Sequence, residues 1–367
     1  MIDHKEMIQL TDKMDTLLAE YKVPGVSYGL FDEQQQVCFS AGKLGAQASS
    51  CVNDKSLFHA CSMSKLVTSL MVLKLVDSGV LNLDQPINEY LKHWQLRSYD
   101  PSLAHTVTLA TLLNHTSGIQ DHPDGFIPLH EGDDIPSLLT ILSGTSVYNP
   151  KPIEQDQAVG EFSYSDAGFC LIEYVLGEVS GKSFPSLAEE LIFTPLGLTG
   201  SLFEHPSLFC QSSSMLKVKG IDSLSFAFGH NKQGDLIKEK RATYPYLASA
   251  GLWSNATDLT KLLIGVSQGL KGKGELGISS HLLKRMISPQ SQPSWAGLGV
   301  FLQGDANNKV IFSMGWGVGF QCKLVCNVSK GSGAIVLTNS DPGCDQDNAL
   351  TGEIIRSLKK IIGFDSL

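Results

Sequence analysis

Strand-like segments stand near both ends of this 367-residue sequence, and helix-like segments fill most of the stretch between them. Apolar and β-branched runs bounded by turn residues are typical of strands and occur at residues 26–31, 37–40, 297–301, 309–312, 320–327 and 333–338. Such an order favours one sheet built from both parts of the chain. We therefore expect an α+β fold with an antiparallel sheet built from both chain termini and flanked by helices.

Helical periodicity defines the rest of the chain. The pattern predicts helices at residues 5–21, 63–76, 108–113, 166–179, 186–193, 255–265 and 348–362. Gly79 is a candidate C-terminal cap and Asn255 a candidate N-terminal cap. The helices between the two groups of strands indicate an inserted, mostly helical domain. We place this insert at residues 86–244 and the α/β sheet domain at residues 1–85 and 245–367.

Composition and charge exclude several classes of protein. Hydrophobic residues make up 42% and charged residues 18% of the sequence, which is typical of a globular protein. A net charge of −9 without a lysine- or arginine-rich block argues against nucleic acid and anionic membranes as partners. No apolar run reaches the ~18 residues that a membrane span needs. The polar N-terminus shows no signal peptide, so we expect a cytoplasmic protein, or a periplasmic one if a signal was trimmed.

Cysteines and histidines do not form a metal-binding pattern. The eight cysteines contain no Cys-x-x-Cys pair, so we expect neither zinc nor a disulfide framework, and most of them as buried apolar residues (38, 51, 61, 170, 210, 322, 326 and 344). His115, His122 and His130 are spaced irregularly and are expected in hydrogen-bonding or solvated roles. We expect no metal and no organic cofactor.

The strongest chemical signal is Ser62-Met63-Ser64-Lys65, at the start of the most apolar helix-like stretch. Residues three apart on a helix share a face, so the Ser62 hydroxyl and the Lys65 amine are expected side by side. A serine becomes a nucleophile when a nearby base takes its proton. The spacing therefore makes Ser62 a candidate nucleophile and Lys65 a candidate base.

Two other serines compete for this role and fail on context. Ser27 and Ser267 each lie in a Gly-x-Ser-x-Gly pattern. That pattern indicates a nucleophile only in a tight turn that leads from a strand into a helix. Ser27 lies inside a predicted strand and Ser267 follows a predicted helix, so neither position fits.

A second motif, Tyr164-Ser165-Asp166, resembles the Tyr-x-Asn element of the serine β-lactamase-like superfamily, which includes class C β-lactamases, D,D-peptidases and related esterases. Further segments match this superfamily in order along nearly the whole chain (residues 24–26, 58–65, 79–87, 112–119, 195–198, 250–254, 297–300 and 336–339). So many collinear matches are far more specific than any single motif. The sequence is identified as a member of this superfamily.

The resemblance implies the roles of four side chains. Ser62 would attack an acyl carbonyl, and Lys65 and Tyr164 would move its proton, either one serving as the base. Asp166 stands where the superfamily has asparagine. An aspartate accepts a hydrogen bond from Lys65, but its charge raises the lysine pKa and shifts the work of the base toward Tyr164.

The third motif of the superfamily departs from the expected pattern. Where Lys-Thr-Gly or His-x-Gly is expected, the chain has Ser313-Met314-Gly315. Ser313 and Gly315 are candidate substrate-binding residues without a cation to hold a substrate carboxylate. Backbone N–H groups of Ser62 and Trp316 are candidates for an oxyanion hole. The Trp316 side chain either lines an apolar substrate pocket or packs as an ordinary strand residue.

The resemblance implies a serine hydrolase that forms an acyl-enzyme on Ser62. We expect a small-molecule substrate, and an esterase or small-amide hydrolase is favoured because Ser313 carries no charge. Two alternatives remain open: a β-lactamase or D,D-/D-amino-acid peptidase that acts on a lactam or peptide, and a catalytically inactive binding homologue. The sequence leaves the oligomeric state open.

Overall fold

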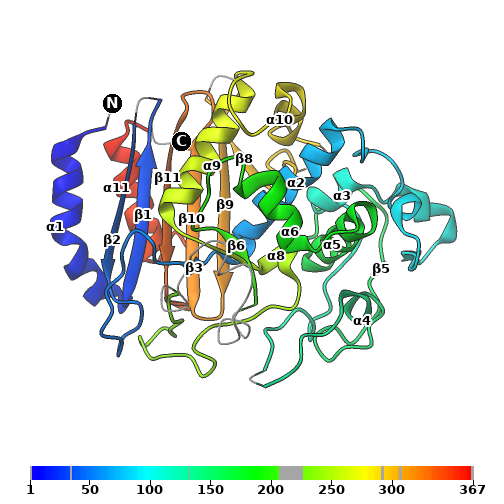
Figure 1. Ribbon diagram of the computed structural model, residues 1–367, viewed down its shortest axis with the longest axis horizontal. Helices are drawn as coiled ribbons and strands as arrows, with labels where there is room; N and C mark the ends of the chain where they lie inside the picture. The colour runs from blue at the N-terminus through cyan, green and yellow to red at the C-terminus, as the bar shows by residue number, and fades with distance from the viewer. Residues whose placement is uncertain are drawn as a thin grey trace.

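The computed structural model describes residues 2–33, 35–130, 132–205, 226–290, 293–305 and 308–364. Its centre is a six-stranded antiparallel sheet in the order β2-β1-β11-β10-β9-β8 (Figure 1). Because these strands come from both ends of the chain, the predicted α+β fold is confirmed. The strands are β1 (Gly25–Phe31), β2 (Gln36–Gly42), β8 (Phe301–Gln303), β9 (Val310–Gly317), β10 (Phe320–Asn327) and β11 (Ser332–Thr338).

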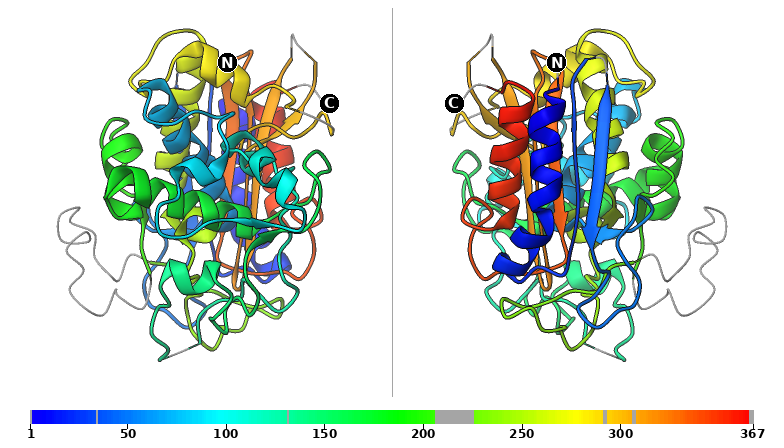
Figure 2. Two further views of the ribbon diagram at one scale, coloured as in Figure 1. Left: turned by 90° about the vertical axis from the view of Figure 1, so that its right-hand side faces the viewer. Right: turned by 90° about the vertical axis from the view of Figure 1, so that its left-hand side faces the viewer.

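Helices cover both faces of this sheet. The helices α1 (His4–Tyr21) and α11 (Leu350–Ile361) lie side by side on one face, whereas α9 (Ala256–Leu270) packs on the other (Figure 2). Every residue of β1, β10 and β11 is buried, which explains why these strands are apolar runs without alternation. The Asn255 side chain accepts the Asp258 N–H at 2.9 Å and begins α9 as predicted.

The helix α2 (Ser64–Asp77) runs between the sheet and the helical part of the molecule (Figure 1). It is buried at nearly all of its positions, as expected of a helix that is apolar on every side. Gly79, just past its end, has φ +76°, a conformation that glycine adopts without strain. The helical part consists of α3 (Leu109–Leu113), α4 (Leu138–Leu142), α5 (Asp166–Ser180) and α6 (Phe184–Ala188), which continues as a π-helical turn at Glu189–Phe193.

Short elements connect the two parts. The strand β7 (Leu252–Ser254) pairs with β3 (Phe58–His59) and with β6 (Leu202–Phe203), and the segment around Phe228 bonds to Leu44. Residues 202–203 and the segment around Phe228, which we assigned to the helical insert, therefore pair with the sheet part. The division into domains stays a prediction. The remaining elements are α8 (Leu247–Ala250), α10 (Ser280–Met286), β4 (Arg97–Ser98), β5 (Glu154–Gln155) and two 3₁₀ helices (Ile87–Tyr90 and Pro101–Thr106).

One predicted strand, at residues 297–301, is wrong for most of its length. The strand β8 begins only at Phe301, and residues 297–300 form a turn. Gly299 has φ +71°, and its N–H donates to the Leu113 carbonyl at 2.8 Å instead of to a neighbouring strand. Leu298 and Val300 of this segment are buried, although the segment is not a strand. In contrast, β9 continues to Gly317, well beyond the predicted end at residue 312.

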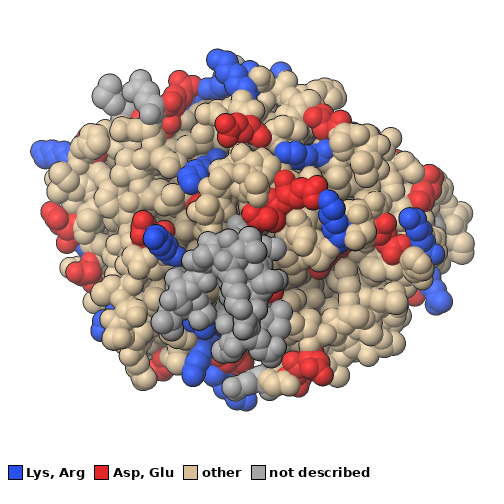
Figure 3. Space-filling model, in the orientation of Figure 1, with Lys and Arg blue, Asp and Glu red and all other residues tan. Residues whose placement is uncertain are grey.

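The other expectations concern cysteines and the surface. Four described cysteines are buried, two are partly buried and Cys51 is exposed, and all seven are free; Cys210 lies outside the described residues (buried: 61, 170, 322, 326; partly buried: 38, 344). Basic and acidic side chains are interspersed on the face in Figure 3. Among the described residues, no helix is long and apolar enough to span a membrane.

Candidate active site

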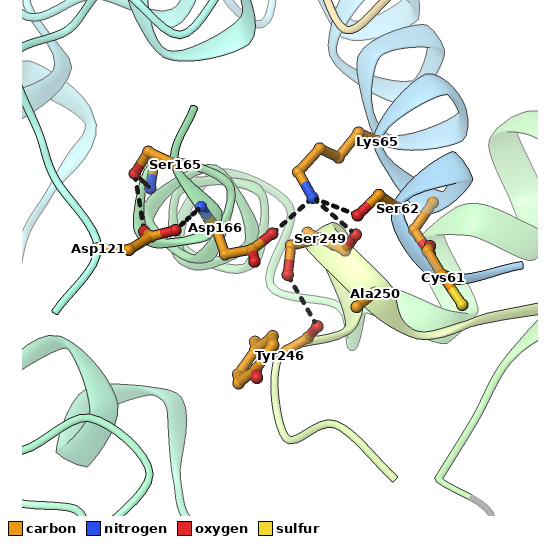
Figure 4. A network of polar contacts seen from close by, with 12 residues as sticks. Cys61, Ser62, Lys65, Asp121, Ser165, Asp166, Tyr246, Ser249 and Ala250 are labelled. Carbon is orange, nitrogen blue, oxygen red and sulfur yellow. Dashed lines mark hydrogen bonds and ion pairs between the residues drawn. The ribbon is translucent and has the colours of Figure 1, made fainter. Parts of the chain in front are cut away.

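Ser62 lies in a 3₁₀ turn (Cys61–Met63) that leads into α2. The turn is held at its start by the Ala60 N–H, which donates to the Leu252 carbonyl at 2.8 Å. Cys61 has φ +47°, which is uncommon for a residue other than glycine. The Lys65 amine reaches back from the first turn of α2 and lies 3.3 Å from the Ser62 hydroxyl oxygen (Figure 4). The two side chains are therefore neighbours, as their spacing predicts.

Lys65 is an enclosed ammonium with a partner for each of its three N–H groups. Its side chain is only 4% exposed. Nζ donates to Ser62 Oγ, to Asp166 Oδ1 at 2.6 Å and to the Ser249 carbonyl at 3.1 Å. Burial lowers the pKa of Lys65, but Asp166 and Tyr164 together outweigh burial and raise this pKa above that of a free lysine. Lys65 therefore holds its proton at neutral pH.

Asp166 is the first residue of α5, where the helix dipole favours a negative charge. The Asp121 carboxylate holds this helix end: it accepts the Asp166 N–H at 2.9 Å, the Ala167 N–H at 2.8 Å and the Ser165 hydroxyl at 3.1 Å (Figure 4). These bonds fix the backbone from which the Asp166 side chain projects toward Lys65. Sequence analysis missed Asp121, although it stands directly after the segment 112–119.

Tyr164 brings its phenol to the same point from the loop before α5. Lys65 Nζ lies 4.8 Å from the centre of the Tyr164 ring, and the phenol interacts with the side chains of both Lys65 and Ser62. The Tyr164 side chain is 39% exposed, but its phenol group is packed among protein atoms at the site. Loss of water around the phenol raises its pKa above the ordinary value, against the opposing effect of the Lys65 ammonium. Ser62, Lys65, Tyr164 and Asp166 thus meet, although α2 and α5 are about a hundred residues apart in sequence.

His115 supports Tyr164 from behind. The two rings stack with 4.5 Å between their centres, and His115 Nδ1 accepts the Ser165 N–H at 3.1 Å. Burial and the nearby Lys65 ammonium lower the pKa of His115 to about 3, so the imidazole is neutral. The predicted hydrogen-bonding role is confirmed, but the contact with Tyr164 could not be seen in the sequence. His122 and His130 lie outside this cluster, in the loop that follows.

The strand β9 forms the opposite side of the site. Gly315 lies against the 3₁₀ turn that carries Ser62, the candidate nucleophile, and we call this turn (Cys61–Met63) the nucleophile turn. A Cβ at Gly315 would come within 2.5 Å of the Ala60 carbonyl oxygen and 2.4 Å of Cys322 Sγ. Only glycine therefore permits this close approach. Because β8 pairs with β9 only as far as Phe312, residues 313–317 have no partner strand on that edge among the residues that the structure describes.

Ser313 and Trp316 have different surroundings on this strand. The Ser313 side chain is buried and lines a cavity together with Ser62. The Trp316 side chain is 46% exposed, and its Nε1 donates to Asp341 Oδ1 at 2.7 Å. It is not among the residues that line the cavity. The Trp316 ring is therefore directed to the surface and does not line this cavity.

The cavity between the two sides has a volume of about 20 Å³. Ser62, Lys65 and Tyr164 line it on the helical side, and Ala296, Val300, Phe301 and Met314 line it on the sheet side (with His115, Gly297, Gly299 and Ser313). A volume of about 10–15 Å³ is needed to hold one water molecule. The innermost part of the cavity thus has room for about one water molecule beside the Ser62 hydroxyl, and the site is open to solvent at Tyr164, which is 39% exposed.

The competing serines lie in the core. Ser27 Oγ accepts the Ala256 N–H at 3.2 Å, and Ser267 Oγ lies 3.5 Å from Cys326 Sγ. Both side chains are buried and neither lines the cavity beside Ser62. Cys61, although it precedes Ser62, directs its sulfur away from Lys65 and toward His59 Nδ1 at 3.2 Å (Figure 4). These positions agree with their exclusion as nucleophiles.

Sequence analysis also missed the segment α8, which acts through its backbone. Its Ser249 carbonyl binds Lys65, and its Ala248 carbonyl accepts the Thr68 hydroxyl at 2.7 Å. Glu173 of α5 accepts the Ala248 N–H at 2.8 Å and so ties α8 to the helix that carries Asp166. Within the part of the chain that the structure describes, no three His, Cys, Asp or Glu side chains are arranged to hold a metal ion.

Comparison with known proteins places this geometry in a family. The family model described as Beta-lactamase matches residues 10–356. The chain is 28% identical over 191 residues to penicillin-binding protein 4 of Amycolatopsis lactamdurans. The aligned residues make up 52% of this chain and 48% of that protein. It is also 25% identical over 266 residues to a β-lactamase of Providencia stuartii. These aligned residues make up 72% of this chain and 60% of that protein. The chain thus spans about half the length of the first of these relatives.

A solved structure shows the same fold. The octameric penicillin-binding protein homologue from Pyrococcus abyssi superposes with a TM-score of 0.74 at 22% identity, over 97% of this chain and 77% of that one. The match of the family model covers nearly the whole sequence in the order that the motifs predict. The chain therefore belongs to the Beta-lactamase family, within the β-lactamase-like serine hydrolase superfamily.

Proposed function

We propose that this protein is a serine hydrolase that forms an acyl-enzyme on Ser62 and acts on a small ester or amide. One observation carries the proposal: the Ser62 hydroxyl, the Lys65 ammonium and the Tyr164 phenol line one cavity, and Asp166 is bonded to Lys65 at 2.6 Å. A nucleophile, a proton-transfer group and a fixed positive charge are the parts that acyl transfer requires.

Tyr164 is the proton-transfer group in this proposal. Because Asp166 keeps Lys65 protonated, the lysine does not accept the Ser62 proton but stabilises negative charge on the Tyr164 oxygen. In the fraction of molecules in which Tyr164 has lost its proton to the solvent, the phenolate takes the Ser62 proton as Oγ attacks the carbonyl carbon, and then gives the proton to the leaving group. His115 holds the Tyr164 ring in place by stacking and remains neutral throughout.

The tetrahedral intermediate needs donors for its oxyanion. The backbone N–H groups of Ser62 and Trp316 are our candidates, because the edge of β9 at residues 313–317 lies beside the nucleophile turn and is free of β8. One such donor is typically worth about 10²–10³ in rate. This contribution depends on the backbone and survives the change from a cationic residue to Ser313.

The missing cation decides the preferred substrate. None of residues 313–317 is ionisable, so a substrate carboxylate finds no ammonium or imidazolium on β9. We therefore favour an uncharged ester or amide over a β-lactam, which carries a carboxylate. The name of the Providencia stuartii relative supports one alternative, a β-lactamase. A D,D-/D-amino-acid peptidase is the other enzymatic alternative. The inactive binding homologue is the third possibility.

Fluorophosphonate labelling followed by mass spectrometry of the labelled peptide tests the nucleophile. We expect the wild type to carry the label on Ser62 and the Ser62→Ala variant to carry none. Ser27→Ala and Ser267→Ala are matched controls that should label like the wild type. Labelling that persists in Ser62→Ala would contradict the assignment, and a wild type that is never labelled would favour the inactive homologue.

Parallel assays with a short-chain methyl ester and with the cephalosporin nitrocefin test the substrate class. We expect kcat/KM for the ester to exceed that for nitrocefin. Rapid nitrocefin hydrolysis with slow ester cleavage would instead support the β-lactamase alternative.

A further inference from the structure

Two buried cysteines meet where β9 lies against the nucleophile turn. Cys61 is the first residue of that turn, and Cys322 of β10 is paired with Gly315. A Cβ at Gly315 would come within 2.4 Å of Cys322 Sγ and 3.0 Å of Cys61 Cβ. The Cys322 thiol also donates to the carbonyl of Ala60, the residue before Cys61, at 3.1 Å. The absence of a side chain at Gly315 therefore brings together two free cysteines from distant parts of the sequence.

Cys61 has a partner that can take its proton. Its Sγ lies 3.2 Å from His59 Nδ1, and His59 Nε2 lies 2.6 Å from the Ala250 carbonyl oxygen. Because a carbonyl only accepts, Nε2 carries a hydrogen, and Nδ1 of the neutral ring can accept the Cys61 proton. Burial raises the pKa of the Cys61 thiol, but the hydrogen bond with Cys322 and the nearby His59 together outweigh burial and lower this pKa. Cys61 is therefore the more readily ionised thiol of the two.

Cys322 has the opposite character. Its side chain is fully buried on β10, and burial together with Cys61 raises the pKa of its thiol well above the ordinary value. The two thiols interact directly with each other. A thiol that ionises readily beside one that stays protonated is the arrangement in which an oxidised sulfur is captured by its neighbour.

The Cys61 sulfur lies just below the surface of the molecule. Gly317 covers it: a Cβ at Gly317 would come within 3.0 Å of Cys61 Sγ and 2.9 Å of Tyr244 Oη. Gly317 is partly exposed, and the side chains of Trp316 and Val318 on either side of it are 46% and 37% exposed. Cys61 itself is only 2% exposed, so a small oxidant such as hydrogen peroxide suits this approach, whereas a bulky disulfide reagent does not.

We propose that Cys61 and Cys322 form a modification site at which hydrogen peroxide produces a disulfide, and that this disulfide stops the reaction at Ser62. The effect on Ser62 rests on the proposed function, whereas the formation of the disulfide does not. The pair is distinct from the cavity that Ser62, Lys65 and Tyr164 line, because neither cysteine lines that cavity.

The oxidation balances in two steps. In the first, the Cys61 sulfur attacks one peroxide oxygen, the oxygen–oxygen bond breaks, and a sulfenic acid forms while hydroxide leaves and takes the proton held by His59. In the second, the Cys322 sulfur attacks the Cys61 sulfur, the sulfur–oxygen bond breaks, and water leaves with the Cys322 proton. Both thiols are oxidised, and the peroxide is reduced to water.

The disulfide acts on Ser62 through the main chain. A bond to Cys322 requires the Cys61 sulfur to leave His59, its partner at 3.2 Å. Ser62 is the next residue, and Cys61 has φ +47°, a conformation with little room for adjustment. Because a displacement of about 1 Å of a reacting group can cost about 10²-fold in rate, we expect fluorophosphonate labelling of Ser62 to slow by at least about tenfold.

Peptide mapping by mass spectrometry under non-reducing conditions tests the site in the wild type after treatment with hydrogen peroxide. We expect a peptide pair joined between Cys61 and Cys322, lighter by two hydrogen atoms than the reduced pair, and slower labelling of Ser62 in the same sample. Oxidation of other cysteines alone, such as the exposed Cys51, would overturn the proposal.

Two further outcomes separate the parts of this inference. A Cys61–Cys322 disulfide in a sample that labels on Ser62 at the full rate would overturn the effect on Ser62. A reduced protein that never labels on Ser62 would overturn the proposed function, while the mapping still decides whether the disulfide forms.

Cys322→Ser distinguishes a reactive pair from a single oxidised thiol. Without the neighbouring thiol, Cys61 should gain oxygen atoms and form no disulfide. Cys326→Ser is the matched control, because Cys326 is also fully buried on β10 and its Sγ lies 3.5 Å from Ser267 Oγ. It should form the Cys61–Cys322 disulfide like the wild type. Cys61 joined to another cysteine in Cys322→Ser, or a disulfide that is lost in Cys326→Ser, would contradict the assignment.

Discussion

The two sides of the candidate site use the chain differently. The helix wall, which we define as Ser62, Lys65, Tyr164 and Asp166, acts through side chains that are buried, charged or hydrogen-bonded to one another. The strand wall, defined as residues 313–317 of β9, has no ionisable side chain, and Trp316 turns its ring to the surface. What the strand wall offers at close range is its backbone.

This contrast explains why the two departures from the superfamily pattern, Asp166 and Ser313, have different consequences. Asp166 replaces asparagine on the helix wall, and the structure absorbs the change because the carboxylate pairs with Lys65 at 2.6 Å. Ser313 replaces a cationic residue on the strand wall, and no residue among 313–317 restores the charge. Under the proposed function, the groups for acyl transfer are therefore kept, while the recognition of a substrate carboxylate is weakened.

The largest predicted effect comes from placing a side chain on the strand wall. Gly315→Ala puts a Cβ 2.5 Å from the Ala60 carbonyl oxygen and 2.4 Å from Cys322 Sγ, so β9 has to move away from the nucleophile turn. We expect kcat/KM to fall by about 10²–10³, the value of a displaced oxyanion donor. Rates of ester hydrolysis and of fluorophosphonate labelling measure the loss.

Gly177→Ala is the control for this change. Gly177 lies within α5, and a Cβ at this position would have no other atom within 4 Å, so alanine there should leave activity unchanged. If Gly315→Ala keeps wild-type activity, the strand wall does not act through a backbone in close contact with Ser62.

A smaller effect, of opposite sign, is predicted on the helix wall. The Asp166 carboxylate raises the pKa values of both Lys65 and Tyr164, so Asp166→Asn should lower both. In the wild type kcat/KM should rise with pH through the alkaline range as Tyr164 loses its proton. In Asp166→Asn this rise should begin at lower pH, and kcat/KM at pH 7 should increase about tenfold if the Tyr164 pKa falls by about one.

The measurement is kcat/KM for a neutral ester from pH 6 to 10. Asp124→Asn is the control, because the Asp124 side chain is 86% exposed and lies outside the Lys65 cluster. A profile that stays in place or moves to higher pH in Asp166→Asn would show that the carboxylate does not set the protonation of this wall.

The sequence predicts the helix wall better than the strand wall for a physical reason. Ser62 and Lys65 are three residues apart, so local geometry alone places them together. The burial of α2 follows from its apolar residues on every side, and the start of α9 from the capping side chain of Asn255. Each of these features depends on residues that are close in sequence.

What the sequence does not predict depends on backbone atoms and on distant segments. The Ser249 carbonyl binds Lys65 across 184 residues of sequence, and any residue type offers a carbonyl. Asp121 reaches the N-terminus of α5 from 45 residues away. The turn at residues 297–300 has the apolar residues of a strand, but the N–H groups of Leu298 and Gly299 bond to helical segments. Three residues of this turn line the cavity (Gly297, Gly299 and Val300).

The smallest predicted effect separates the backbone of the strand wall from its side chains. Trp316→Phe removes the surface hydrogen bond from Nε1 to Asp341 but leaves the Trp316 N–H of the main chain in place. Because a net hydrogen bond is worth about 0.5–1.5 kcal/mol, and this one joins exposed groups, we expect kcat/KM to change by less than about threefold. Asp341→Asn, which keeps an acceptor for Nε1, should change activity even less. If Trp316→Phe instead lowers kcat/KM as far as Gly315→Ala while thermal stability is unchanged, the indole itself contacts the substrate, and the strand wall acts through a side chain as the helix wall does.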